Sequence, residues 1–216
     1  MNTANIIREY GPFPETQNIH GVSHDGSNIW FANGQSLVAL DPDQGKTLRK
    51  LDIAGDAGTA YDGKHLYQLV NGQILKLDPH SGDILASIPA PEGQGNSGLA
   101  WAEGSLWLGR YKDRKIYEID PSTGKILQSL DSNRHVTGVT WVDGELWHAT
   151  WEDGSSEIRQ VDPHTGHVLM SLQMPAGKAV SGLTSGAQNM FYCGGGQSGM
   201  LRAVEKPPSP FENDGQ

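Results

Sequence analysis

The chain has 216 residues, of which 36% are hydrophobic, 19% are charged and 28 are glycine, so it is long enough for one turn-rich folded domain. Its 16 basic and 25 acidic residues give a formal net charge of −9, which excludes a basic surface and makes nucleic acid and anionic membranes unsuitable partners. Cys193 is the single cysteine, no signal-peptide pattern opens the chain, and no apolar run approaches a membrane span, so we expect a cytoplasmic protein without disulfides.

Five related units follow one another along the chain, each beginning with a glycine and a short alternating run. The glycines are Gly21, Gly58, Gly98, Gly138 and Gly182. A polar turn and an apolar-aromatic run come next, and together they predict a β-hairpin. A third run ending in Asp-Pro, a glycine turn and a fourth run complete the unit, as in "KIYEIDPSTGKILQSL". Four short strands repeated about every 40 residues predict a β-propeller.

The repeats place blades at about residues 18–51, 55–88, 95–130, 135–172 and 179–204. The fifth unit lacks its fourth strand, whereas residues 4–10, "ANIIREY", have the pattern of a fourth strand without a preceding unit. Pairing residues 4–10 with the last blade closes the ring and covers an exposed edge.

We therefore expect an all-β fold, a single five-bladed β-propeller over residues 1–206 with four antiparallel strands per blade. The complementary ends favour a closed monomer over a homo-oligomeric ring of six or seven blades. Residues 207–216 are rich in proline and poor in apolar groups, so we expect a disordered tail.

Several recurring residues are best interpreted as architecture. Two aromatic columns are expected to pack between blades, one in the second strands (Trp30, Tyr67, Trp107, Trp147, Phe191) and one in the first strands (His24, Tyr61, Trp101, Trp141, Ser185). The aspartates before proline are expected to cap turns, namely Asp41, Asp78, Asp120 and Asp162. Cys193 is expected to be buried, and the sequence has no zinc-protease, paired-cysteine, nucleophile-elbow or P-loop motif.

The residues just before the repeated glycines are candidates for a site, because a propeller brings these connections to one mouth of its channel. We expect His20, Asp56 and Asn96 to line one arc of the mouth; the hydroxyls of Ser97, Thr137 and Ser181 complete it. His20 is the candidate general base, assisted by Asp56 and Asn96, in the binding of a small polar molecule. The same three side chains can alternatively hold a divalent metal ion, or simply bind channel water and neighbouring backbone.

Longer connections between the second and third strands supply the other candidates. Trp151 is the one tryptophan of six outside the aromatic columns, so it and Tyr111 are expected to stack on a ligand. Arg110 or Lys112 is expected to pair with an anionic group, with Glu152 nearby. The alternative is that Trp151 covers an apolar rim or joins a dimer contact.

Residues 142–169, with "VDGELW", "TW" and "VDPHTGHVL", resemble a blade of the plant-type glutaminyl-peptide cyclotransferases, which are five-bladed propellers. The similarity continues through "IDPSTGKIL" over nearly the whole chain and is shared with streptogramin lyase-like and lactonase-like propellers. It implies conversion of an N-terminal glutamine to pyroglutamate with loss of ammonia, by an acidic residue beside the first repeated glycine and tryptophans around the mouth. Here His20 stands at the position of the acid, while Trp151 matches a loop tryptophan.

Two functions follow from these patterns. The first is a small-molecule-binding propeller that acts, if it is an enzyme, as a lyase, cyclotransferase or lactonase through acid–base or metal-assisted chemistry without a covalent nucleophile. The second is a non-catalytic module whose rim binds protein or carbohydrate, since propellers serve both uses.

Overall fold

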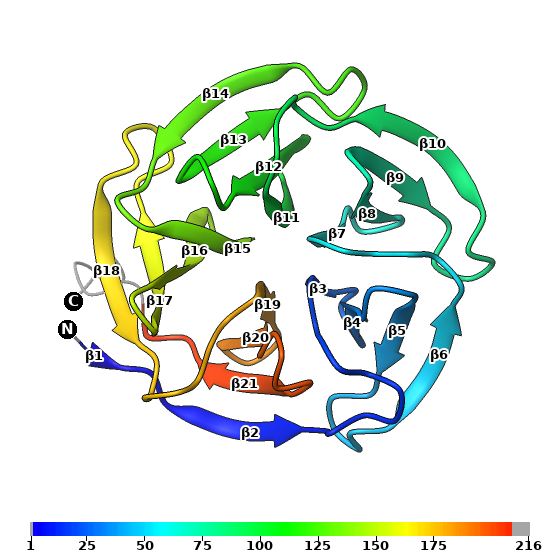
Figure 1. Ribbon diagram of the computed structural model, residues 1–216, viewed down its shortest axis with the longest axis horizontal. Helices are drawn as coiled ribbons and strands as arrows, with labels where there is room; N and C mark the ends of the chain where they lie inside the picture. Colours follow the sequence, from blue (N-terminus) through cyan, green and yellow to red (C-terminus); the bar gives the residue numbers. More distant parts are fainter. Residues whose placement is uncertain (1, 209–216) are drawn as a thin grey trace, which may run out of the picture.

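The computed structural model describes residues 2–208, and every regular element within them is a β-strand. The strands form five sheets arranged as blades around a central axis, as Figure 1 shows. The expected fold, an all-β five-bladed propeller with four antiparallel strands per blade, is confirmed. Within the described residues there is no helix of the length and apolar character that crossing a membrane requires.

Each blade is numbered in chain order, with its first strand nearest the axis (Figure 1). Blade 1 consists of β3 (Val22–His24), β4 (Ile29–Ala32), β5 (Leu37–Leu40) and β6 (Thr47–Leu51). Blade 2 consists of β7 (Thr59–Tyr61), β8 (Leu66–Val70), β9 (Gln73–Leu77) and β10 (Ile84–Pro89). Blade 3 consists of β11 (Asn96–Ala102), β12 (Ser105–Arg110), β13 (Lys115–Ile119) and β14 (Ile126–Asp131). Blade 4 consists of β15 (His135–Val142), β16 (Glu145–Glu152), β17 (Ser155–Val161) and β18 (Val168–Gln173). Blade 5 consists of β19 (Gly182–Gly186), β20 (Met190–Gly194), β21 (Leu201–Glu205) and β2 (Ile6–Tyr10).

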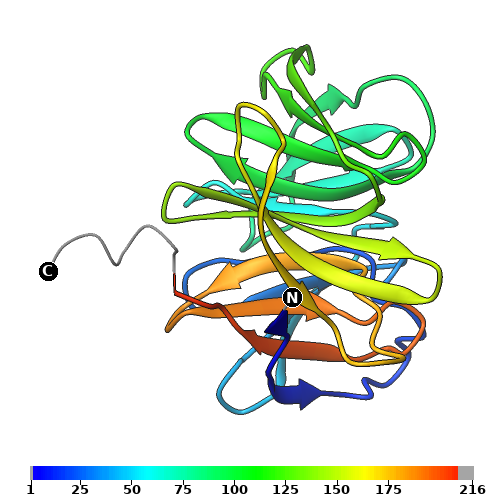
Figure 2. The same ribbon diagram turned by 90° about the vertical axis from the view of Figure 1, so that its left-hand side faces the viewer.

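The ring closes through the N-terminal strand, because β2 pairs antiparallel with β21 as the outer strand of blade 5. The contact is reinforced by Glu9, whose Oε1 accepts from Arg202 Nε at 2.8 Å and Lys178 Nζ at 2.9 Å. A further strand, β1 (Asn2–Thr3), pairs in parallel with β18 on the outside of blade 4. Figure 2 shows this N-terminal segment in blue beside the outer strands. Residues 2–10 therefore connect blades 4 and 5.

The five repeated glycines form a ring around the channel, where each one abuts the next blade. A Cβ added to Gly58 would lie 2.3 Å from the backbone nitrogen of Leu99, and one added to Gly98 would lie 2.4 Å from that of Val139. A Cβ added to Gly21, Gly138 or Gly182 would likewise come within 2.3–2.9 Å of backbone atoms of the neighbouring blade. No side chain fits at these distances, so the repeat uses glycine here for close approach.

Aromatic side chains pack between neighbouring blades, as the first- and second-strand columns predict. Tyr67 stacks on Trp101 with ring centroids 5.4 Å apart, and Trp107 stacks on Trp141 at 5.7 Å. In blade 5 the stacked partner is Tyr192 rather than Phe191. The reason is that the β19–β20 turn is one residue longer, which moves the column along by one position.

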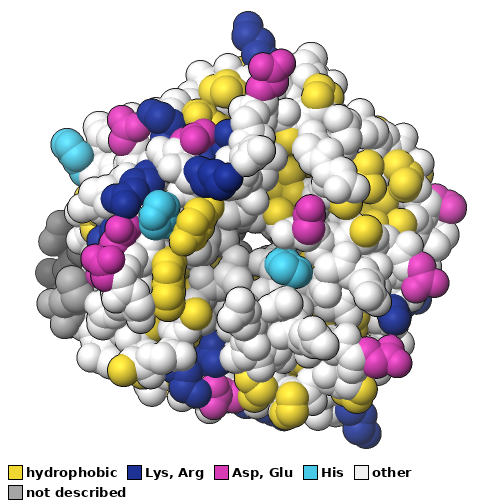
Figure 3. Space-filling model, viewed as in Figure 1, with side chains coloured by type: hydrophobic (Ala, Val, Ile, Leu, Met, Phe, Trp, Pro, Cys, Tyr) yellow, Lys and Arg dark blue, Asp and Glu magenta, His cyan; other side chains and the backbone are white. Residues whose placement is uncertain are grey.

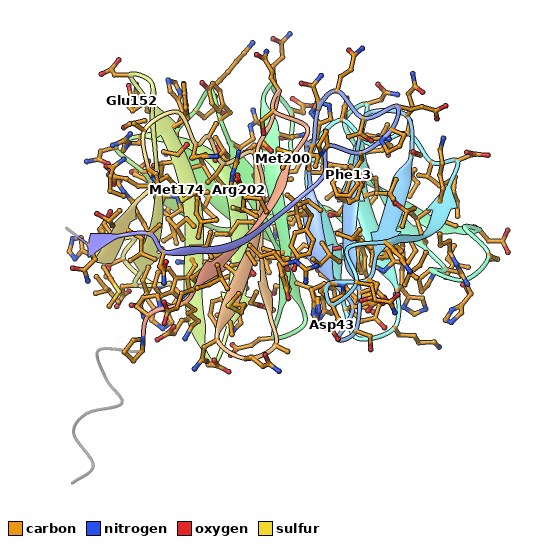
Figure 4. The ribbon with its side chains drawn as sticks, turned by 90° about the horizontal axis from the view of Figure 1, so that it is seen from below. Phe13, Asp43, Glu152, Met174, Met200 and Arg202 are labelled. Atoms are coloured by element: carbon orange, nitrogen blue, oxygen red, sulfur yellow. The ribbon has the colours of Figure 1, made fainter. Side chains whose placement is uncertain are left out.

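The turn between the third and fourth strands is capped by its aspartate in four blades. In blade 1, Oδ1 of Asp41 accepts hydrogen bonds from the backbone nitrogens of Asp43 and Gln44 at 2.8 and 3.0 Å. Asp78, Asp120 and Asp162 make the same pair of bonds in their blades. Figure 4, which views the ring from its side, shows Asp43 of one such turn on the opposite face of the ring from Glu152. The capped turns therefore lie on the face away from the candidate site.

Each outer strand contains a β-bulge, and the bulged residue is an exposed aliphatic side chain. These residues, which we call the outer aliphatic ring, are Ile7, Leu48, Leu85, Leu127 and Leu169, with exposed fractions of 43–57%. Bulges increase local twist and discourage pairing of an edge strand with another chain. The aliphatic side chains that they expose are not explained by core packing.

Candidate functional site

A cavity of about 290 Å³ opens at the mouth of the channel, on the face of the glycine ring that carries the connections between blades. Its lining residues are His20, Asp56, Ala57, Gly95, Asn96, Ser97, Tyr111, Lys112, Thr137 and Ser181. Figure 3 shows this face of the molecule, with a central hollow and a histidine at its edge. The structure thus brings together eight of the eleven predicted site residues, contributed by all five blades.

His20 is positioned by the connection that leads into β3. Its backbone nitrogen donates to the carbonyl of Ala32 at 2.9 Å, and Ile19 before it forms a bridge with Gly196 of blade 5. Burial lowers the pKa of the His20 imidazole, and the nearby carboxylate of Asp56 opposes this shift in part. No hydrogen bond to the imidazole is formed within residues 2–208. At neutral pH the ring is therefore uncharged and has both nitrogens available to a ligand.

Two oxygen atoms at the cavity are buried without a protein partner. They are Oδ1 of Asn96 and Oγ1 of Thr137, which have no hydrogen bond to any described residue. Thr137 is only 8% exposed, so bulk solvent does not reach it freely. An unpaired buried oxygen costs about 1–3 kcal/mol, which a bound water or ligand group can recover.

The two serine hydroxyls of the mouth are used differently from Thr137, because they join neighbouring blades. Ser97 Oγ donates to the carbonyl of Val136 at 2.7 Å. Ser181 Oγ donates to the carbonyl of Ile19 and accepts from the backbone nitrogen of Gly196. Ser97 and Ser181 therefore stabilise the ring at this position, while Thr137 keeps its hydroxyl free.

Tyr111 forms one wall of the cavity and is held flat by a residue that the sequence patterns missed. His135 stacks on Tyr111 with ring centroids 4.4 Å apart and planes 11° apart, and its Nδ1 lies 2.8 Å from the Tyr111 carbonyl oxygen. Beside it, Lys112 Nζ donates to Oε1 of Gln94 at 2.8 Å. Because Gln94 is neutral, the Lys112 charge has no counter-ion in this contact.

Three predicted residues lie outside the cavity. Arg110 is 2% exposed; its Nη1 donates to the carbonyls of Pro91 and Glu92 at 3.0 Å, and its Nη2 pairs with Asp113. Its guanidinium is therefore committed to holding a neighbouring loop and is not free for an anionic ligand.

Glu152 and Trp151 lie near the end of β16, on opposite faces of that strand. Glu152 Oε1 accepts from Arg114 Nη2 at 2.9 Å, which turns it toward blade 3. Trp151 shares the strand face of Trp147, which contacts Phe191 of blade 5. Trp151 therefore faces the blade 5 side, and it does not line the mouth cavity.

The donor set at the mouth fits a transition metal poorly. His20 and Asp56 supply one imidazole and one carboxylate, and Asn96 adds an amide oxygen. Across residues 2–208, no three histidine, cysteine, aspartate or glutamate side chains converge as ligands. Structural and catalytic zinc sites use three or four such ligands, so this arc offers too few.

Fold and cavity together define a five-bladed β-propeller with a cavity at one mouth of its channel. Within that class the chain belongs to the family described as outer membrane protein assembly factor BamB, whose model matches residues 70–205, more than half of the sequence. A comparison with curated protein sequences gives no match.

Solved structures with a similar fold include two named as enzymes and one named as a β-propeller domain. Glutaminyl cyclase of Myxococcus xanthus is similar with a TM-score of 0.75 and 17% identity, over 94% of this chain and 96% of that one. Hydrazine synthase of Kuenenia stuttgartiensis gives 0.53 and 15%, over 83% and 56% of the chains. The Cps50 (Swd1) β-propeller domain of Myceliophteria thermophila gives 0.58 and 10%, over 94% and 100%. The predicted resemblance to glutaminyl cyclases is confirmed for the fold.

Proposed function

We propose that the mouth cavity binds a small polar molecule and that His20 acts on it as a general base, in a reaction of the lyase, cyclotransferase or lactonase type. The observation that carries this proposal is the meeting of an uncharged imidazole with two unpaired buried oxygens in one cavity. A general base works best when its pKa lies near the working pH and its nitrogen is free to accept a proton.

Each lining group has a chemical part in the proposed reaction. Asp56 favours the protonated form of His20 after proton transfer, since its carboxylate raises the pKa of the imidazole. Asn96 Oδ1 accepts a hydrogen bond from a ligand N–H or O–H. Lys112 pairs with developing negative charge on an oxygen, and Tyr111 stacks on a planar group.

Cyclisation of an N-terminal glutaminyl residue is the first reaction to test. The amine nitrogen attacks the side-chain amide carbon, a new C–N bond forms, and the old C–N bond breaks to release ammonia. His20 takes the proton from the attacking amine and returns it to the departing nitrogen, so the enzyme ends unchanged. Opening of a lactone by water uses the same base and needs no covalent intermediate.

The experiment measures ammonia release from glutaminyl peptides and acid release from lactones. His20→Ala is expected to lower turnover by about 100-fold or more, because it removes the base. His164→Ala, in an exposed turn on the other face, is the matched control and should leave turnover unchanged. Equal turnover in wild type and in folded His20→Ala protein would contradict the proposal.

A second candidate function is a non-catalytic interaction module. It is favoured by the outer aliphatic ring and by the name of the matched family, an assembly factor. The two functions make different predictions: Leu127→Glu weakens binding of a partner protein by the module, but leaves turnover at the mouth unchanged. Ligand binding at the mouth without any turnover would favour a binding role.

A further inference from the structure

A second cavity, of about 390 Å³, lies between blades 3 and 4 and shares no lining residue with the mouth. It is lined by Asp131, Ser132, Asn133, His148, Arg159, Gly166, His167 and Val168. Asp131 ends β14, and residues 132–133 belong to the connection that leaves blade 3. Gly166 and His167 lie in the turn before β18, which begins at Val168. The cavity is therefore a space between two sheets.

Two buried polar side chains from facing positions of β16 and β17 line this cavity. His148 and Arg159 are register partners and are 2% and 8% exposed. In blades 1 and 3 the corresponding pairs are wholly hydrophobic or aromatic, Phe31 with Val38 and Leu108 with Tyr117, and in blade 2 Gln68 faces Leu75. In blade 5 the corresponding pair is Cys193 with buried Arg202, whose guanidinium is paired with Glu9. Blade 4 differs from the other four blades in placing a buried imidazole opposite its guanidinium.

The charges around Arg159 do not balance. Glu157 accepts from Arg159 Nε at 2.7 Å through one carboxylate oxygen and pairs with Arg134 through the other. Two guanidinium groups therefore share one carboxylate, which leaves one positive charge in excess. The carboxylate of Asp131 on the rim is paired with Lys115 and does not neutralise it.

Hydrogen-bonding capacity is also left unused on the two lining groups. Arg159 Nη1 donates to Oδ1 of Asn133 at 2.6 Å, whereas Nη2 has no partner among the described residues. Nδ1 of His148 is buried without a side-chain partner there, and its ring interacts with the backbone of Ala149, which partly opposes the lowering of its pKa. Burial, followed by the charge of Arg159, lowers the pKa of His148 to about 3, so its ring is neutral and can carry a proton at one nitrogen. A buried group of this kind is costly unless something pairs with it.

We propose that the cavity between blades 3 and 4 binds a small organic monocarboxylate, held by Arg159 and His148. A single excess positive charge matches a monoanion better than a phosphate dianion, which would leave negative charge uncompensated. The planar carboxylate suits the guanidinium edge, and Val168 offers an apolar surface for the ligand's carbon chain. This site is independent of the chemistry proposed for the channel mouth.

The test follows amide chemical shifts and Tm of the full chain during titration with sodium propionate, with sodium chloride and sodium phosphate at matched ionic strength. Propionate is expected to raise the Tm saturably and to shift the amides of Ser132, His148 and Arg159. His148→Leu, which places the blade 3 residue in blade 4, is expected to fold and to lose at least 10-fold in affinity. Gln68→Leu makes the same change in blade 2 and should respond as wild type does.

Two results would overturn the proposal. One is a change in Tm and amide shifts with propionate that is no larger than the change with chloride, or that is the same in His148→Leu as in the wild type. The other is tighter binding of phosphate than of propionate, which would assign the cavity to a different anion. If His148→Leu fails to fold, Arg159→Met provides the second variant, and retained propionate binding in that variant would equally reject the assignment.

Discussion

Replacing Gly98 by alanine tests the physical reason for the repeated glycine. The new Cβ would lie 2.4 Å from the backbone nitrogen of Val139 and 2.6 Å from the carbonyl carbon of Gly138. Ordinary contacts begin near 3.4 Å, so the inner strands of blades 3 and 4 must separate by about 1 Å. The closed ring opposes this movement, because each of its five glycines abuts the next. We expect the free energy of unfolding to fall by about 3 kcal/mol, which is the upper end of the usual cost of adding atoms to a packed core.

For a chain of this size that loss corresponds to a decrease in Tm of about 6–12 °C, measured by calorimetry. Gly104→Ala is the matched control, because its Cβ would meet no atom within 4 Å although its φ of +86° is left-handed. That substitution should cost about 1 kcal/mol through backbone strain alone. If Gly98→Ala lost no more stability than Gly104→Ala, close approach of the blades would not explain the repeat.

Three further predictions concern buried groups elsewhere. As pH falls, the unfolded chain protonates His148 near its ordinary pKa of 6.5 and the folded chain only near 3, so stability is lost across that window. His148→Leu should flatten this part of the pH dependence in urea denaturation and raise the Tm at pH 5; an unchanged slope would contradict the assignment. Burial raises the pKa of the Cys193 thiol to about 12, so a thiol reagent at pH 8 should react only after unfolding, and rapid native-state labelling would refute this. Glu9→Gln should cost about 2 kcal/mol in urea denaturation, because it leaves buried Arg202 without its ion pair at the closure, whereas a neutral effect would show that β2 holds without it.

Much of the fold was predictable because each feature is repeated in several blades. The glycine, the hairpin and the Asp-Pro turn recur, so a weak local pattern becomes strong when the units are aligned. β1 was not predictable, since two residues carry no periodicity. The aromatic column passes through Tyr192 and not Phe191 because the β19–β20 turn has one extra residue. Counting the same number of residues from the glycine in every blade could not reveal this.

The mouth was predictable for residues whose place is set by the repeat itself. His20, Asp56 and Asn96 stand just before the glycines of their blades, and the ring of glycines brings them together. Arg110 was not placed correctly, because the loop sequence does not show that its guanidinium turns to backbone carbonyls. Trp151 lies four residues after Trp147 on the same strand, so both side chains point to the same face of the sheet. Counting this alternation would have predicted that Trp151 faces blade 5 and not the mouth.

The cavity between blades 3 and 4 was missed for a related reason. His148 and Arg159 occupy ordinary interior positions of β16 and β17, and neither belongs to a sequence motif. Only the register between the two strands shows that an imidazole faces a guanidinium in blade 4, a pair that no other blade has at this position.

The most direct test of the mouth as a ligand site is a chemical-shift map with a set of small polar compounds, including glutaminyl dipeptides and lactones. We predict that at least one compound perturbs the amides of His20, Asn96, Tyr111 and Thr137 together, and that His20→Ala weakens this response. Perturbations confined to the outer aliphatic ring, or none with any compound, would contradict a binding site at the channel mouth.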